Sequence, residues 1–114
     1  MPFVKTNPCA ASGFFEAEAA GLAWLAEAES YGGARTVRVE SVSAGRIELE
    51  QLESARPTPD AAVRFGRALA VTHGAGAQAF GAAPDGWDGP TFIGARPMMT
   101  SRPGASMAIC GTAT

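Results

Sequence analysis

The sequence predicts an α+β fold in which three antiparallel strands pack against one helix, followed by a second helix and an irregular tail. Residues 36–42 and 46–52 alternate polar and apolar side chains around a Ser-Ala-Gly turn, which is typical of a half-buried hairpin. Apolar residues recur at helical spacing in residues 12–31 and again in residues 58–73. Beyond residue 74, glycine, proline and alanine dominate and no period is sustained.

Length and composition limit the classes of function. The 114 residues fit one small domain, and the hydrophobic fraction of 46% with a charged fraction of 18% is typical of folded globular proteins. The net charge of −2 provides no broad positive surface for a phosphate backbone. Nucleic acid is therefore not an expected partner.

The chain shows no targeting or metal-binding pattern. Residues 1–8 lack the basic segment and apolar core of a signal peptide, and no apolar run approaches membrane-spanning length. Cys9 and Cys110 lie far apart without the spacing of a zinc site or a disulfide framework. These features predict a cytoplasmic protein with no membrane partner and no metal ligand.

Residues 1–52 are expected to form the sheet and the helix that covers it. Residues 3–6 are β-prone and end at a proline, which disfavours helix for the residue before it. The first helix should begin at Ser12, which can act as its N-cap, and stop at the glycine pair 32–33. Its apolar face consists of Phe15, Ala19, Leu22, Leu25 and Ala26.

Residues 53–94 are expected to contain a connecting segment, a second helix and a loop. Thr58 can cap this helix, Pro59 suits its first position, and Asp60 is favourable in its first turn. The helix should run to about residue 73, with an apolar stripe made of Ala62, Phe65, Leu69 and Thr72.

One ion pair is suggested by the first helix. Glu18 shares a helical face with Phe15 and Leu22, where an unpaired carboxylate is costly. Lys5, on the preceding strand, is the nearest cation in sequence and can meet Glu18 if the helix packs on the sheet. Kinases use a lysine held by a helical glutamate to orient the phosphates of ATP. Spacing alone favours the simpler alternative, a solvated lysine and a helix-edge glutamate without a ligand.

Five segments of the chain follow one another in a characteristic order. They are residues 3–7 (FVKTN), 15–25 (FEAEAAGLAWL), 47–52 (IELEQL), 65–73 (FGRALAVTH) and 80–87 (FGAAPDGW). Their order and spacing resemble consecutive blocks of the ketosamine (fructosamine) kinases, a family within the protein kinase-like group that includes aminoglycoside and choline kinases. The resemblance covers about residues 3–94.

The resemblance implies a partial kinase small lobe in residues 1–52, followed by a hinge. Lys5 would contact the α- and β-phosphates of ATP, and Glu18, in a Glu-x-x-x-Leu pattern, would hold Lys5. The carbonyl of Glu50 and the amide of Leu52 would hydrogen-bond adenine. Intact relatives would use ATP and magnesium to phosphorylate glycated amines.

Other parts of the family's machinery have no counterpart in the sequence. Only four residues precede Lys5, too few for a hairpin over the phosphates, and no His-Gly-Asp catalytic loop follows His73. Residues 95–114 do not resemble the family, which a frameshift near residues 94–98 would explain. We therefore expect an inactive fragment without catalytic or magnesium-binding residues.

Two other interpretations stay open. The chain could be a non-catalytic module that self-associates through exposed edges and apolar surface, or a decayed reading frame without a selected function. His73, in the last turn of its helix, fits a structural role better than that of a base or metal ligand. Trp24 and Trp87 are expected to pack in a core or interface rather than to stack on a ligand.

Overall fold

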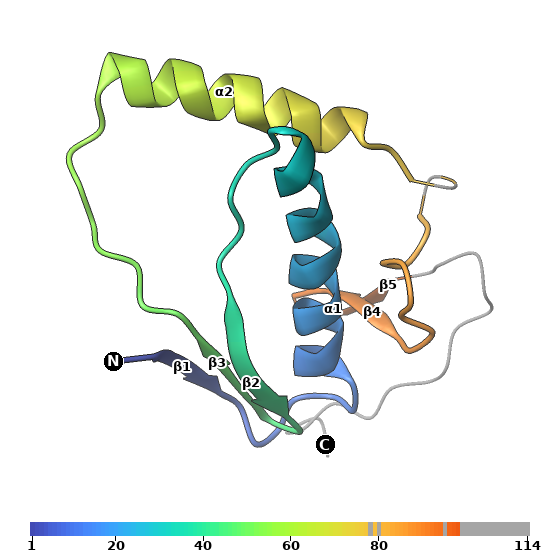
Figure 1. Cartoon of the computed structure of the whole chain (residues 1–114). Helices are drawn as coiled ribbons and strands as arrows, with labels where there is room; N and C mark the ends of the chain where they lie inside the picture. Colours follow the sequence, from blue (N-terminus) through green and yellow to red (C-terminus); the bar gives the residue numbers. More distant parts are fainter. Residues whose placement is uncertain (78, 80, 95, 99–114) are drawn as a thin grey trace.

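The computed structural model describes residues 1–77, 79, 81–94 and 96–98, and its fold is α+β, as predicted. A three-stranded antiparallel sheet of order β1-β3-β2 is followed by a second helix and a small two-stranded sheet (Figure 1). In chain order the elements are β1 (Phe3–Thr6), α1 (Phe14–Ala26), the 3-10 helix η1 (Glu27–Tyr31), β2 (Val39–Ser43), β3 (Arg46–Leu49), α2 (Pro59–Gly74), β4 (Thr91–Ile93) and β5 (Arg96–Met98).

The register of the sheet decides which side chains α1 covers. β1 pairs with β3 so that Lys5 lies opposite Ile47 and Phe3 lies opposite Leu49. Paired residues of an antiparallel ladder project to the same face, as do residues two apart in a strand. Ile47 is fully buried and packs with Leu49 and with Phe15 of α1 in the core. Lys5 therefore lies on the face of the sheet that α1 covers.

A β-bulge between Val39 and Ser41 explains an irregular spacing in the sequence. Val39 pairs with Leu49 and Val42 pairs with Ile47, although the two valines are three residues apart. The extra residue of a bulge shifts the strand by one position. Both valines therefore share the face of the core strand residues.

Both arms of the hairpin are shorter than predicted. β2 begins at Val39, because the amide of Thr36 donates to the carboxylate of Glu29 at 3.0 Å instead of joining a ladder. β3 ends at Leu49, and the side chain of the next residue, Glu50, folds back toward β2. Beyond the paired residues, the two arms are joined by side-chain hydrogen bonds and by one backbone hydrogen bond from the amide of Glu50 to the carbonyl of Arg38.

The N-cap of α1 is Gly13 rather than Ser12, so the capping prediction is wrong. Gly13 has a φ of 84°, in the left-handed region that favours glycine. A Cβ atom at this position would also lie 3.1 Å from Pro90. At the other end, Gly32 with a φ of 95° terminates η1, which confirms the predicted stop at the glycine pair.

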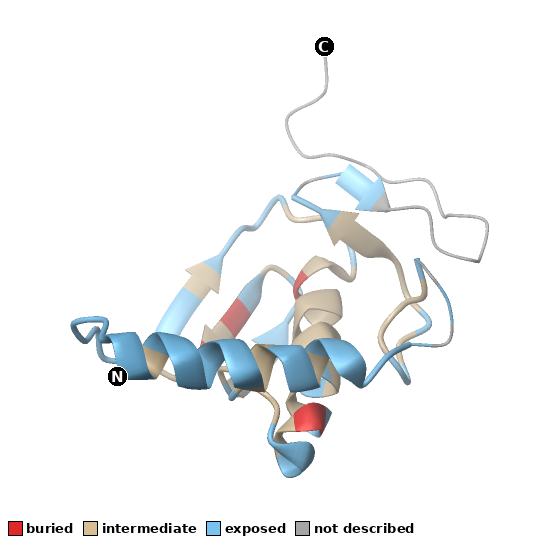
Figure 2. Ribbon diagram, turned by 90° about the horizontal axis from the view of Figure 1, so that it is seen from above, coloured by how far each residue is buried: buried red, intermediate tan, exposed pale blue. Residues whose placement is uncertain are grey.

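Thr58 caps α2 as predicted, because its hydroxyl accepts a hydrogen bond from the amide of Ala61 at 3.1 Å. The predicted apolar stripe of this helix is largely wrong. No residue of α2 is buried, and Phe65 is 59% exposed. α2 lies across the end of α1 and meets η1 there, so most of its surface faces outward (Figure 1, Figure 2).

Besides its contact with η1, α2 makes a polar contact with the segment that follows η1. Thr72, the last member of the predicted stripe, accepts a hydrogen bond from the amide of Ala34 at 2.9 Å and donates one to the carbonyl of Ala68 at 3.2 Å. The hydroxyl therefore joins α2 to the segment that follows η1.

Residues 81–94 pack along α1, although the sequence predicted an irregular loop. Pro84 lies beside Gly21, and the ring centroids of Phe92 and Phe14 are 5.2 Å apart. The hairpin of β4 and β5 was not predicted, because strands of three residues are too short to show a period. Residues 99–114 lie outside the described residues, with Cys110 and most of the segment expected to be irregular or out of frame.

Candidate functional site

Lys5 Nζ and Glu18 Oε1 form an ion pair that joins β1 to α1. The contact that sequence spacing left open is therefore confirmed. The side chains are 40% and 31% exposed, so the pair can be reached from solvent. Pairs with this much exposure contribute roughly 0–1 kcal/mol to folding. The main consequence of the pair is thus to hold the ammonium in one place.

A pocket of about 390 Å³ lies beside this pair, between α1 and residues 81–94. Its walls include the aromatic rings of Phe14 and Phe92. Two oxygen atoms of residues that line it, Glu18 Oε2 and Thr91 Oγ1, are buried without a hydrogen-bond partner among the described residues. Leaving such an atom unpaired costs about 1–3 kcal/mol. The pocket therefore combines a cation, a carboxylate and a hydroxyl between apolar walls.

The residues expected to form the hinge directly follow β3. Leu52 is 55% exposed. Among the described residues, no hydrogen bond uses the Glu50 carbonyl or the Leu52 amide. One backbone acceptor and one backbone donor, two residues apart, are therefore available to a ligand.

Glu50, the first of the expected hinge residues, belongs to a network of four charged side chains. The guanidinium of Arg38 donates two hydrogen bonds of 2.7 Å to the carboxylate of Glu29 in η1. The guanidinium of Arg35 donates to the carboxylate of Glu50, with nitrogen–oxygen distances of 2.8 and 3.0 Å. We call Glu29, Arg35, Arg38 and Glu50 the hinge network.

Backbone hydrogen bonds complete the hinge network. The amide of Arg38 donates to Oε1 of Glu50 at 2.8 Å, and the amide of Glu50 donates to the carbonyl of Arg38 at 2.9 Å. Glu50 is thus held through its side chain and its backbone. Its carbonyl is left for other partners within the described structure.

Both carboxylates of the hinge network are ionised at neutral pH. Hydrogen bonds from the Arg38 guanidinium and then from the Thr36 amide lower the pKa of Glu29 from 4.5 to about 2. Hydrogen bonds from the Arg35 guanidinium and then from the Arg38 amide lower the pKa of Glu50. Two cations therefore face two anions, and the network carries no net charge.

Trp87 has a structural role, as predicted. Its Nε1 donates to the carbonyl of Pro90 at 2.9 Å, and its ring lies so close to Gly89 that a Cβ atom there would be 2.4 Å from it. This packing shapes the turn that leads into β4.

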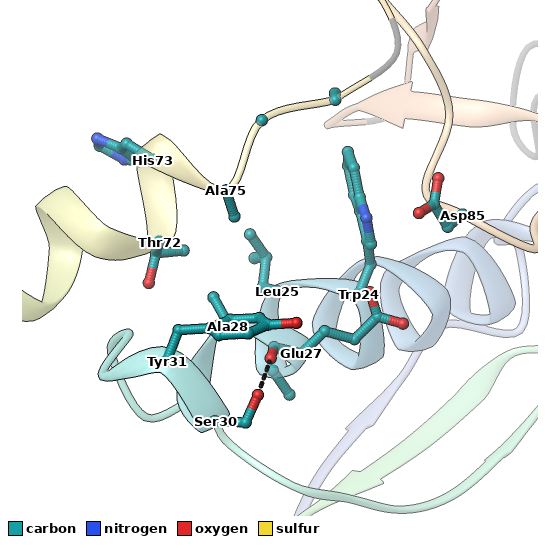
Figure 3. A pocket seen from close by; sticks show the side chains of 13 residues that line it. Trp24, Leu25, Glu27, Ala28, Ser30, Tyr31, Thr72, His73, Ala75 and Asp85 are labelled. Atoms are coloured by element: carbon teal, nitrogen blue, oxygen red, sulfur yellow. Dashed lines mark hydrogen bonds between the residues drawn. The ribbon is translucent and has the colours of Figure 1, made fainter.

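A second, wider pocket of about 850 Å³ lies where α1 and η1 meet the end of α2 (Figure 3). Trp24 and Tyr31 contribute to it from α1 and η1, His73 from α2, and Asp85 from the following loop. Tyr31 is 77% exposed, and His73 and Asp85 are exposed as well. We assign no ligand to this open surface, and the structural roles expected for Trp24 and His73 stay predictions.

Within residues 1–77, 79, 81–94 and 96–98, no group of three or more His, Cys, Asp or Glu side chains could hold a metal ion. None of the helices described there is both long enough and apolar enough to cross a membrane.

The model of the fructosamine kinase family matches residues 1–100 of the chain. The chain belongs to the fructosamine kinase family. The match reaches beyond residue 94, where the resemblance noted in the sequence ends.

A solved structure supports the assignment to the fructosamine kinases. The chain is similar to the crystal structure of a protein named "putative fructosamine-3-kinase" from Thermobifida fusca, with 38% identity and a TM-score of 0.71. The similarity covers 90% of this chain and 34% of that protein, so the chain spans about a third of its solved relative. No functionally curated protein matches the chain.

Sequence reasoning identified the Lys5–Glu18 pair but missed two features of the site. The hinge network has no motif, because its members are spread over residues 29–50 among other arginines and glutamates. Thr91 had no signal, because its place beside Glu18 depends on the packing of residues 81–94 along α1.

Proposed function

We propose that this chain is the nucleotide-binding part of an ATP-dependent kinase of the fructosamine kinase family. The observation that carries the proposal is the Lys5–Glu18 ion pair beside a polar pocket. An ammonium has three donors, and Glu18 uses one of them. The other two can bind the α- and β-phosphates of ATP, while Glu18 keeps the flexible lysine in position.

The hinge backbone groups that have no hydrogen-bond partner among the described residues support an adenine site. In this proposal the Glu50 carbonyl and the Leu52 amide bind the base. Ile47, the partner of Lys5 in the ladder, precedes Glu50 by three residues, or about 10 Å along an extended strand. A ribose and its linkages bridge a base and its phosphates over a distance of that order.

The substrate and the metal belong to the same proposal. Family membership favours a fructosamine or a related glycated amine as the phosphate acceptor in intact relatives, with ATP and magnesium as co-substrates. The sequence has no His-Gly-Asp catalytic loop. We therefore propose that this chain alone binds nucleotide without transferring a phosphoryl group.

Isothermal titration of the chain with ATP and magnesium tests this proposal. We expect binding by the wild type, and at least about tenfold weaker binding by Lys5→Met, because charge-assisted hydrogen bonds are worth about 1.5–3 kcal/mol. Arg46→Met is the matched control, since Arg46 pairs with Glu48 on the same sheet. Equal affinities for all three proteins, or no binding by the wild type, would contradict the proposal.

A phosphorylation assay completes the test. With ATP and a fructosamine substrate we expect no product from this chain. Turnover would show that the catalytic residues lie within it and would overturn the claim that it only binds nucleotide.

The exposed surface of α2 favours a second candidate function, self-association. Val63 and Phe65 are 52% and 59% exposed on one stretch of this helix. Phe65 is the largest exposed apolar side chain of this helix, which makes it a candidate interface residue. Sedimentation velocity of the wild type and of Phe65→Asp, with and without ATP, separates the two functions. A dimer that dissociates in the variant and ignores ATP would support self-association, whereas a monomer throughout would exclude it.

A further inference from the structure

We infer that the hinge network positions the adenine-binding backbone, with Arg38 as its central positioning residue. The inference deepens the proposed nucleotide site and rests on it. Arg38 and its partner Glu29 do not contact the nucleotide in this account. They act through Glu50, whose carbonyl is the proposed acceptor for the base.

The first step of the argument is that Glu50 has little freedom left. Its amide donates to the carbonyl of Arg38, and its carboxylate accepts from the amide of Arg38. These two hydrogen bonds close a ring between one residue before the hairpin and one residue after it. The Arg35 guanidinium binds the same carboxylate in a bidentate manner, which adds geometric specificity. These contacts hold the amide and the side chain of the residue that carries the proposed acceptor carbonyl.

The second step is that Arg38 is itself anchored. Its guanidinium forms the bidentate pair with Glu29 and also donates to the carbonyl of Thr36 at 2.9 Å. Glu29 accepts from the amide of Thr36 as well. The segment before β2 is therefore bound to η1 as well as to Glu50.

The third step is that η1 directly continues α1, the helix that carries Glu18. The proposed phosphate contact and the proposed base contact are thus joined by one helical run and by Arg38. β3 ends at Leu49, and the next residue, Glu50, keeps one backbone hydrogen bond to Arg38 while its carboxylate joins the network.

A single exposed ion pair contributes little to stability, whereas bidentate hydrogen bonds hold their side chains in a defined geometry. We therefore expect a local effect on the hinge rather than a large effect on the stability of the whole chain. Arg46 again provides the control. It pairs with Glu48 at 2.5 Å in the same sheet, and its side chain is 45% exposed against 49% for Arg38.

The first measurement is amide hydrogen exchange of the nucleotide-free chain. In Arg38→Met we expect the amide of Glu50 to exchange at least about fivefold faster than in the wild type, because its ring with residue 38 loses the anchor to η1. Arg38→Lys should give an intermediate rate, because an ammonium keeps the charge but not the bidentate geometry. In Arg46→Met the rate should not change. If Arg38→Met leaves exchange at Glu50 unchanged, or Arg46→Met accelerates it equally, the inference is wrong, whatever the chain binds.

The second measurement compares ATP with inorganic tripolyphosphate by titration calorimetry. Arg38→Met should weaken ATP binding by about three- to tenfold and leave tripolyphosphate binding unchanged, because it disturbs the site of the base alone. Lys5→Met should weaken both ligands. Equal losses of both ligands in Arg38→Met would show a general structural role and overturn the inference. If the wild type binds neither ligand, the proposed nucleotide function fails, and hydrogen exchange alone decides whether the network orders the hinge.

Discussion

Lys5 meets Glu18 because the β1–β3 register turns the lysine toward the face of the sheet that α1 covers. The same register places Ile47, the partner of Lys5, in the centre of the core. Packing of Phe15 on Ile47 therefore fixes the helix that presents Glu18. The candidate site and the core depend on one another.

The ion pair should be visible as a coupling energy. Lys5→Met and Glu18→Gln should each lower the free energy of unfolding by less than about 1 kcal/mol, since both side chains are partly exposed. The double variant should lose little more than either single variant, because the pair is already broken. Urea denaturation of the four proteins measures this cycle. Strictly additive losses would show that the pair does not form in solution.

Gly13→Ala should destabilise the chain by at least about 1–2 kcal/mol, because an L side chain is strained at this positive φ. The new Cβ atom would also press on Pro90. Gly66→Ala is the matched control in the exposed middle of α2, where a Cβ atom meets nothing within 4 Å. There alanine should stabilise by about 0.5–1 kcal/mol. Thermal denaturation checks both variants, and shifts of the same sign would refute this account of the α1 N-cap.

Ile47→Ala should cost about 2–5 kcal/mol, as is typical when a fully buried aliphatic side chain is truncated. In a domain with so small a core, this loss should unfold a large fraction of the molecules. Val42→Ala serves as the comparison, because Val42 lies opposite Ile47 but is 38% exposed. It should cost about 1 kcal/mol or less. Circular dichroism during urea denaturation distinguishes the two, and equal losses would argue against this core.

Acid should weaken the hinge network through Glu29. Its pKa is about 2 in the folded chain and 4.5 in the absence of its partners. Because the folded pKa is depressed, the stability that ionised Glu29 contributes is complete above about pH 4.5 and is lost as the pH falls toward 2. Glu29→Gln should therefore flatten the loss of stability in this pH range. Glu27→Gln, an exposed neighbour in η1, should retain the wild-type dependence, and a flattened curve in both variants would exclude a specific role of Glu29.

Local chemistry was enough to predict most of the elements. Thr58 caps α2 because a threonine hydroxyl needs only the amides of the next turn. The hairpin of β2 and β3 follows from period-two alternation around a tight turn. The pair of Lys5 with Glu18 needed one further condition, that the first helix packs on the sheet.

Contacts between distant segments decided the rest. Gly13, the N-cap of α1, lies against Pro90, which comes from the far end of the described chain. The Glu50 carboxylate binds the Arg35 guanidinium and the backbone amide of Arg38, which come from the segment before β2. By itself, the sequence determined the three strands of the first sheet, the two α-helices and the family resemblance, and it suggested the pair of Lys5 with Glu18. Only the tertiary structure decided where the strands end and which groups border the site, because these depend on the geometry of residues brought together by folding.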